Sequence, residues 1–318
     1  MHKLARKVCD RLAYTARGAA ARVVVAARAF EPLESFVICS DPRGGSTWLS
    51  EIVAQIPRTA RIWEPLNIQA VRRFQDLGFA WRQHIHENAD WPEAERALSD
   101  ALRGRILNGW TVRPGSLTDL ATADRLTVKF CRANALLPWL TRRFKFRHKP
   151  IHLVRHPLAV VASQLSYGAW DAPYEGFVIP SGPHSELWQE HAEYLSSLST
   201  KAEALTAVWA LTNRISLDHP RANADWLTVY YEDLLAEPER EIERIFDVWD
   251  EPVPKSAATQ ARVASATTKT ATFEQGVEYQ LAKWQRALSD RQIDSMLSVL
   301  QYFGIRQYGI ELRPQSGR

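Results

Sequence analysis

Residues 36–48 read FVICSDPRGGSTW. Positions 36–39 form an apolar run with the length and composition of a strand that is covered on both faces. Pro42 ends this strand, because proline donates no ladder hydrogen bond and restricts the residue before it. The stretch therefore predicts a buried strand, a tight turn and a helix in immediate succession, which is the repeating unit of a parallel α/β sheet.

The turn after this strand carries groups that suit a phosphate. Gly44 and Gly45 permit positive φ values and let the backbone approach a ligand closely. Ser46 and Thr47 follow at the amino end of the helix, where free N–H groups and the macrodipole favour an anion. Arg43 adds a permanent charge with a planar fork of donors. No lysine precedes the serine, so this is not a Walker A loop. An ordinary strand-to-helix corner with a capping serine remains the alternative.

A second segment, residues 149–165, reads KPIHLVRHPLAVVASQL. Positions 151–154 predict another short buried strand, and Pro157 suits the first turn of a helix. Arg155 ends the strand, and Ser163 follows eight residues later, about two helical turns on. Ligands of open α/β sheets bind beyond the carboxyl ends of the strands, so Arg155 is expected on the same rim as the arginine of the first turn. Taken alone, Arg155 also fits a surface arginine that caps a carbonyl group.

These two segments resemble the sulfotransferase family that uses 3′-phosphoadenosine-5′-phosphosulfate (PAPS). Residues 41–48 are similar to that family's 5′-phosphosulfate loop. The resemblance implies donor contacts from Arg43, Gly44, Gly45, Ser46, Thr47 and Trp48. Arg155-His156-Pro157 with Ser163 is similar to the motif that holds the 3′-phosphate, the group that distinguishes PAPS from ATP. Residues 230–235 (YYEDLL) are similar to the family's Y-E-D-L segment, and the resemblance spans roughly residues 35 to 305.

The resemblance also implies a general base. Glu64, in the sequence WEPL at 63–66, is similar to the E-P-L segment of the carbohydrate branch of the family, where the glutamate takes the proton of the acceptor hydroxyl. It ends a predicted strand on the same rim. The alternative is a carboxylate paired with a nearby arginine, such as Arg43.

The chain departs from the phenol and steroid branch at two places. That branch has a lysine where Arg43 stands, and its K-x-H segment supplies a histidine base where this chain has Lys129-Phe130-Cys131. Cys131 is a poor substitute for that base, which favours the carbohydrate-like branch. Lys129 is assigned to the leaving group or the sulfonate, with a structural ion pair as the alternative. By a looser resemblance, Lys269, which precedes Trp284 in the sequence, is expected to contact the 3′-phosphate.

The wider pattern favours an α/β, P-loop-like, three-layer fold with a central parallel sheet flanked by helices. Further strands are expected at 61–63, 126–130 and 227–231, and helices at 46–55, 68–77, 92–103, 157–167, 185–217, 237–248 and 290–303. At 318 residues and 46% hydrophobic composition, residues 31–318 are expected to form a single domain. The loop 168–183, rich in glycine, proline and aromatic residues, fits a substrate lid or a plain surface loop.

Residues 1–30 hold seven Lys and Arg residues and one Asp, so their net charge is +6. The whole chain has a net charge of +4, so the remaining residues carry −2. Residues 1–30 predict a basic amphipathic helix that contacts an anionic membrane surface, or one that packs on the domain. Arginines interrupt every apolar run, so neither a transmembrane segment nor a signal peptide is expected. Together with three scattered cysteines, this favours a cytoplasmic location, with peripheral membrane contact left open. No nucleic-acid motif occurs, and the histidines lack metal-ligand spacing, so no metal is predicted.

The sequence therefore predicts an enzyme that moves the sulfuryl group of PAPS to a hydroxyl of a sugar, glycolipid or related metabolite. Arg43 is expected to stabilise the leaving phosphate, and Glu64 to act as the base. Two other functions remain open. One is a nucleotide-dependent kinase, which lacks the Walker lysine and an evident magnesium ligand; the other is a non-catalytic domain that binds a nucleotide or a membrane.

Overall fold

The computed structural model describes residues 2–265 and 275–315. At its centre lies a sheet of five parallel strands in the order β2-β3-β1-β4-β5. The strands are β1 (Phe36–Ser40), β2 (Thr59–Trp63), β3 (Arg125–Phe130), β4 (Ile151–Val154) and β5 (Leu227–Tyr230). Because the chain leaves β1 toward β2 and later returns to β4 on the other side, the carboxyl end of β1 is a topological switch point. The predicted parallel α/β sheet is confirmed.

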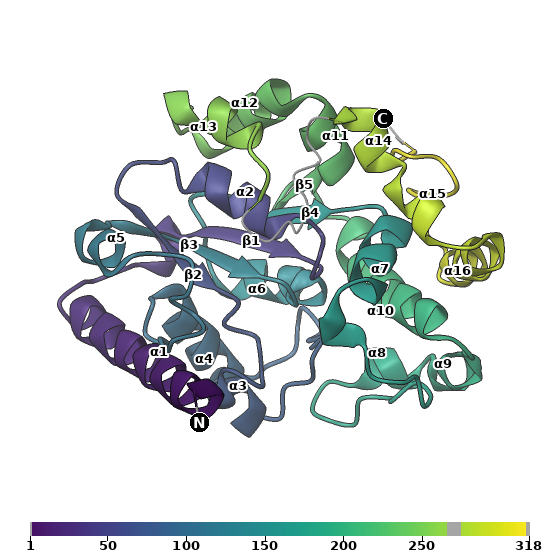
Figure 1. Ribbon diagram of the computed structural model, residues 1–318, viewed down its shortest axis with the longest axis horizontal. Coiled ribbons are helices and arrows are strands. Elements are labelled where there is room, and N and C mark those ends of the chain that lie inside the picture. Colours follow the sequence, from purple (N-terminus) through teal and green to yellow (C-terminus); the bar gives the residue numbers. More distant parts are fainter. Residues whose placement is uncertain (1, 266–274, 316–318) are drawn as a thin grey trace.

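Helices cover both faces of the sheet (Figure 1). One face carries α1 (His2–Ala26), α3 (Arg72–Asp76), α4 (Pro92–Leu102), α5 (Leu117–Thr122) and α6 (Leu137–Arg143). The other carries α2 (Ser46–Val53), α11 (Tyr231–Ala236), α12 (Pro238–Trp249), α13 (Lys255–Ala261) and α14 (Val277–Leu281). A further cluster contains α7 (Pro157–Leu165), α8 (Glu186–Gln189), α9 (Ala192–Ser197), α10 (Lys201–Leu217), α15 (Lys283–Ala287) and α16 (Asp290–Tyr302).

Strand β1 shows why the sequence forms these layers. Phe36 and Ile38 join the cluster formed with α2 and α12, whereas Val37 and Cys39 join the cluster formed with α4 and α6. All four side chains are fully buried. A strand that is apolar at successive positions must be covered on both faces, and this holds the phosphate loop that follows β1 on a rigid support.

Two of the expected helical regions differ from those observed, and α5 and α6 were not expected. The region 185–217 is divided into α8, α9 and α10, because a capping box at Thr200 and Glu203 starts a new helix. The helix expected over 68–77 is confined to α3, since the Asn67 side chain accepts a hydrogen bond from a backbone N–H three residues on and forms a turn.

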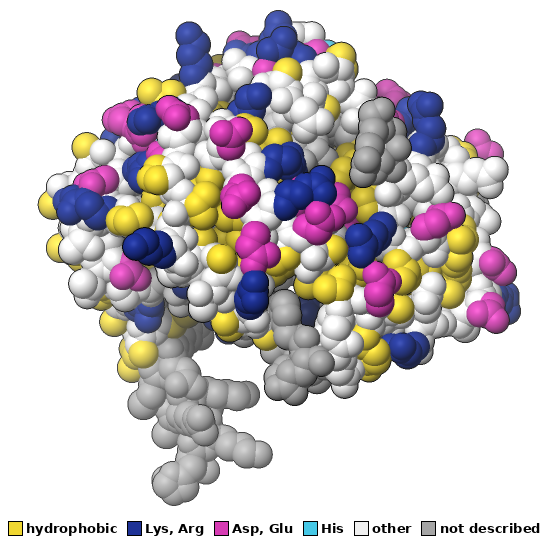
Figure 2. Space-filling view, turned by 90° about the horizontal axis from the view of Figure 1, so that it is seen from above, with side chains coloured by type: hydrophobic (Ala, Val, Ile, Leu, Met, Phe, Trp, Pro, Cys, Tyr) yellow, Lys and Arg dark blue, Asp and Glu magenta, His cyan; other side chains and the backbone are white. Residues whose placement is uncertain are grey.

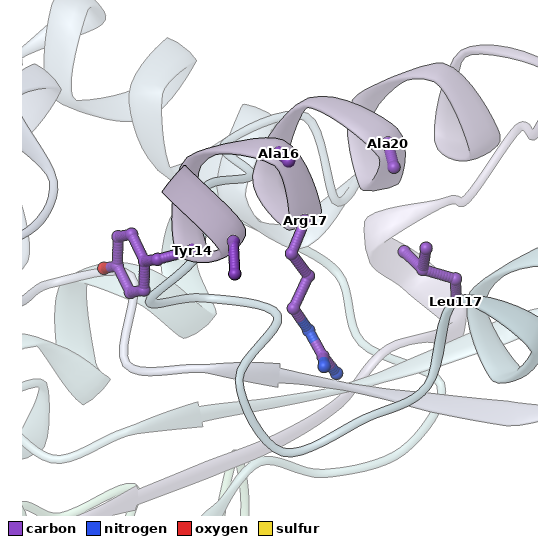
Figure 3. A pocket seen from close by; sticks show the side chains of 6 residues that line it. Tyr14, Ala16, Arg17, Ala20 and Leu117 are labelled. Carbon is purple, nitrogen blue, oxygen red and sulfur yellow. The ribbon is translucent and has the colours of Figure 1, made fainter. Parts of the chain in front are cut away.

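Helix α1 packs beside α5 and directs basic side chains at the body of the protein. Figure 3 shows Arg17 pointing away from α1, and its guanidinium donates to the carbonyl of Gly115. Arg22 donates to the carbonyl of Leu107 at 2.9 Å, and Arg28 binds a carbonyl next to α5. These three cations therefore attach the helix to the domain, and contact of residues 1–30 with a membrane stays a prediction.

Within the described residues, no helix combines the length and the apolarity that a membrane crossing requires. On the face seen in Figure 2, basic and acidic side chains are interspersed and do not gather into large patches of one sign.

Candidate active site

The phosphate loop joins β1 to α2 and has a backbone that only particular residues adopt. Gly45 has φ of +97°, and a Cβ atom added there would lie 2.5 Å from Cδ2 of Tyr231. Arg43 also has a positive φ, +71°. Such values are uncommon for residues with a side chain and occur preferentially at functional sites. The loop therefore has a fixed shape that brings backbone N–H groups close to the start of α2.

Strand β4 and helix α7 hold this loop in place. The Arg155 guanidinium donates to the Arg43 carbonyl at 3.0 Å, and Gln164 Nε2 donates to the Pro42 carbonyl at 2.9 Å. Arg43 Nε donates to Ser163 Oγ at 3.0 Å. Three residues expected on one rim, Arg43, Arg155 and Ser163, are thus brought together.

Two tyrosines support the paired arginines. The Arg43 guanidinium carbon lies 4.8 Å from the ring centre of Tyr167, and that of Arg155 lies 4.4 Å from the ring centre of Tyr231. Burial, followed by repulsion from Arg155, lowers the pKa of Arg43. Two adjacent guanidinium groups with this environment suit a multiply charged anion such as a phosphate.

A second charged group lies at the carboxyl ends of β2 and β3. Lys129 Nζ lies 3.0 Å from Glu64 Oε1, and an Arg132 terminal nitrogen lies 2.9 Å from Glu64 Oε2. The Lys129 side chain is only 2% exposed and the Glu64 side chain 12%. The register of β2 against β3 brings Lys129 and Glu64 together, because Lys129 pairs with Trp63, the residue before Glu64. The alternative expected for Glu64, a pair with a nearby arginine, is thus present, and the arginine is Arg132.

The two cations control the charge of Glu64. Burial by itself raises the pKa of Glu64, but Lys129 and Arg132 outweigh it and lower the pKa to about 2. Glu64 is therefore ionised at neutral pH. Its φ of +38° is the second positive value at a strand end of this rim. By contrast, burial raises the pKa of the Cys131 thiol to about 11, so this thiol stays protonated at neutral pH.

Lys129 connects the two halves of the site. Its Nζ atom lies 3.4 Å from Oγ1 of Thr47, at the start of α2, as well as beside Glu64. The same atom sits 3.2 Å from the ring centre of Trp63, whose π face stabilises the buried cation. A single ammonium group therefore contacts both the phosphate loop and the carboxylate.

A buried carboxylate positions the turn that carries Arg155. Glu232 accepts hydrogen bonds from the backbone N–H of His156 at 2.8 Å and from the hydroxyl of Tyr308 at 2.9 Å. Burial raises the pKa of Glu232 to about 7. The Y-E-D-L segment thus fixes the turn after β4 through Glu232, while Tyr231 fills the space beside Gly45.

The family follows from a comparison with known proteins. The model of the Sulfotransferase family matches residues 35–255. The chain belongs to the sulfotransferase family. The resemblance found in the motifs is confirmed at this level, and so is the expectation of a sulfotransferase-type enzyme.

Solved structures similar to this sulfotransferase include two sulfotransferases from distant sources. The sulfotransferase domain of the Synechococcus PCC 7002 olefin synthase is 20% identical, with a TM-score of 0.45, over 87% of this chain and 95% of that chain. A mouse sulfotransferase complexed with PAP is 13% identical, with a TM-score of 0.43, over 90% of this chain and 89% of that chain. Comparison with curated proteins gives no match.

Two predicted donor-binding residues of the sulfotransferase stand apart from the others. The Trp48 side chain is 3% exposed and packs edge-on against Tyr231 with 5.6 Å between the ring centres, so it supports the loop from the core. Lys269 lies outside the described residues. Gly44, Ser46 and Thr47 occupy the turn and the first residues of α2, as expected.

Sequence reasoning did not identify Arg132 and Arg82 in this sulfotransferase. Arg132 is the second residue after β3, so the rule that placed Arg155 on the rim applies to it as well. Arg82 lies in a loop between α3 and α4, and no motif marks it. In the described part of the chain, no group of three or more His, Cys, Asp or Glu residues is arranged to hold a metal ion.

Proposed function

We propose that this sulfotransferase moves the sulfuryl group of PAPS to a hydroxyl of a sugar, glycolipid or related metabolite. The observation that carries the proposal is the contact of one loop with two charged groups. On the β4 side the loop touches Arg155 and Ser163, and on the β3 side it touches Lys129, which pairs with Glu64. This arrangement suits a donor with a phosphate at each end and an acceptor that must lose a proton.

The fit to the donor rests on the chain's own geometry. Gly45 holds a positive φ at the turn, where a Cβ atom would collide with Tyr231, and the Arg43 and Arg155 side chains contact Ser163 and the loop backbone. In this proposal Arg155 and Ser163 hold the 3′-phosphate. Arg43, Ser46, Thr47 and the loop N–H groups hold the 5′-phosphosulfate.

When bound, PAPS supplies a sulfuryl group whose S–O bond to the 5′-phosphate breaks as the acceptor oxygen bonds to sulfur. Glu64 accepts the proton of the acceptor hydroxyl. Arg43 and Lys129 stabilise the negative charge that develops on the departing phosphate oxygen. As in other group transfers of this kind, positioning and electrostatics supply most of the acceleration.

The low pKa of Glu64 bears directly on its role as a base. A carboxylate with a pKa of about 2 is ionised but takes up a proton weakly. Because Lys129 also touches Thr47, an anion in the loop competes with Glu64 for this ammonium group. We infer that donor binding draws Lys129 toward the loop and raises the basicity of Glu64.

The first test is calorimetric titration of the protein with PAP and with AMP, which lacks the 3′-phosphate. Hydrogen bonds to charged groups contribute about 1.5–3 kcal/mol, so Arg155→Ala should weaken PAP binding about ten- to a hundred-fold and leave AMP binding unchanged. Arg147→Ala removes a half-exposed arginine ahead of β4 and serves as the control. Equal losses for PAP and AMP would show that Arg155 acts only by supporting the loop. Failure of the wild type to bind PAP would refute the proposed donor.

A further inference from the structure

Two arginines on the β2–β3 side of the rim have hydrogen-bonding capacity that the described residues do not use. The Nε atoms of Arg82 and Arg132 are both buried, and neither has a hydrogen-bond partner among the described residues. Within the same residues, Arg82 also forms no ion pair. A buried guanidinium nitrogen without an acceptor is unfavourable, and a bound anion would satisfy it.

Arg82 follows Trp81, whose ring centre lies 4.5 Å from the guanidinium carbon of Arg132, the partner of Glu64. Burial, followed by repulsion from Arg132, lowers the pKa of Arg82 to about 10, while Asp41, Cys131 and Glu64 act in the opposite direction. These neighbours lie at the carboxyl ends of β1, β3 and β2. Strands β2 and β3 lie on one side of β1, and β4 lies on the other. Arg82 is therefore on the Glu64 side of the sheet edge and away from Arg155.

The carboxylates of this region are already engaged. Glu64 pairs with Lys129 and Arg132. Asp41 accepts from the side-chain amides of Asn134 at 3.0 Å and Asn213 at 2.7 Å. Burial raises the pKa of Asp41 to about 6, and attraction by Arg82 acts in the opposite direction. The β2–β3 side therefore has an excess of positive charge.

The backbone holds Arg82 in position. The neighbouring Gln83 is buried, accepts from the N–H of Ala80 at 2.9 Å and donates to the carbonyls of His84 and Pro183, both at 2.7 Å. The loop is thus pinned on itself and on the end of the segment 168–183. The site requires little reorganisation to bind an anion, which favours affinity.

Aromatic rings adjoin the same cations. The Arg132 guanidinium carbon lies 4.5 Å from the ring centre of Trp81, which is 36% exposed, and Lys129 covers Trp63. Partly exposed indole faces next to cations suit a ring-bearing molecule with a negative charge.

We propose that the acceptor carries an anionic group, a carboxylate or a phosphate, near its reactive hydroxyl, and that Arg82 and Arg132 bind this group. The proposal rests on the proposed function and specifies its acceptor class. It assigns Arg82 a role in acceptor specificity, separate from the donor contacts of Arg43 and Arg155.

The test uses acceptor pairs that differ in charge, with PAP release as the readout. The pairs are methyl β-D-glucoside with methyl β-D-glucuronide, glucose with glucose 6-phosphate, and 4-hydroxybenzyl alcohol with 4-hydroxybenzoate. Carboxylates and phosphates are thereby distinguished. We expect the anionic member of at least one pair to be preferred. Arg82→Gln should lower kcat/KM for it about ten- to a hundred-fold, the range for a hydrogen bond to a charged group. The KM for PAPS should not change.

Arg96→Gln is the matched control, because Arg96 lies on the exposed surface of α4, where it pairs with Glu93. Its kinetics should equal those of the wild type. The same acceptors are also titrated into PAP-saturated protein, with tryptophan fluorescence as the readout, so that binding is measured even without turnover. Anionic members should bind more tightly than neutral ones, and Arg82→Gln should remove the difference.

Three results would overturn the inference while leaving the proposed function intact. They are a preference for neutral acceptors, no binding of any anionic member to the PAP-saturated protein, and an Arg82→Gln variant that raises the KM for PAPS with every acceptor alike. Failure of the wild type to bind PAP would instead refute the proposed function itself.

Discussion

Replacing Glu64 by glutamine should affect stability and turnover in separable ways. The pKa of Glu64 falls from 4.5 in an unperturbed carboxyl to about 2. Each pKa unit corresponds to about 1.4 kcal/mol, so the ionised carboxylate contributes about 3 kcal/mol to the free energy of unfolding. A depressed pKa gives stability that is fully present above about pH 4.5 and disappears as the pH falls toward 2. Glu64→Gln should therefore lose about 3 kcal/mol at pH 7, and the loss should shrink below pH 4.5.

Urea denaturation of the wild type and Glu64→Gln at pH 7 and pH 3 measures both values. Glu93→Gln is the control, because Glu93 forms an exposed pair with Arg96, and exposed pairs contribute about 0–1 kcal/mol. The same loss at both pH values would refute the reasoning, since it would show that the charge of Glu64 is not what stabilises the fold.

The kinetic consequence of the same substitution tests the base. Turnover should fall about a hundred-fold or more, the usual scale for a general base. PAP binding should be retained or become tighter, because Lys129 and Arg132 lose their counter-charge. Unchanged turnover in a folded variant would mean that another group takes the proton.

Two further substitutions test the supports of the loop. Gly45→Ala should lose about 2–5 kcal/mol of stability, because it adds a collision with Tyr231 to the strain of a positive φ. Gly176→Ala, also at a positive φ but in open space, should lose only the strain component of about 1–2 kcal/mol, and equal losses in urea denaturation would contradict this account. Glu232 has a raised pKa of about 7, so it contributes stability that is lost as the pH rises from about 4.5 to 7. Glu232→Gln should lack this contribution, so the difference in urea midpoint between the wild type and the variant should change from pH 5 to 8, and a constant difference would contradict this account.

Local sequence was sufficient to predict that Arg43, Arg155 and Ser163 lie close together at one edge of the sheet. The order of strand, glycine turn and helix placed Arg43 at the end of β1, and the same reasoning placed Arg155 and Ser163 after β4. All three meet because parallel strands end at one edge of the sheet. The branch of the family and the roles of individual residues remain predictions.

The acceptor side depends on contacts that are distant in sequence. Glu64 meets Lys129 and Arg132 through the register of β2 against β3, which no local pattern encodes. Arg82 reaches the rim only through a loop that is fixed by hydrogen bonds from Gln83. The sequence predicted one helical region over 185–217 and did not predict the break before Thr200. The break is set by a capping box at Thr200 and Glu203, which is a local signal.

The positive φ values of Arg43 and Glu64 imply a conflict between robustness and activity. A residue with a side chain in this conformation costs about 1–3 kcal/mol, and glycine adopts it freely. At Arg43, glycine would relieve the strain and at the same time remove a guanidinium from the donor site. A laboratory selection for heat resistance alone would therefore tend to accept glycine at this position, and by our proposal the more stable variant would bind its donor less well. Directed evolution of this enzyme should retain a selection for turnover in every round.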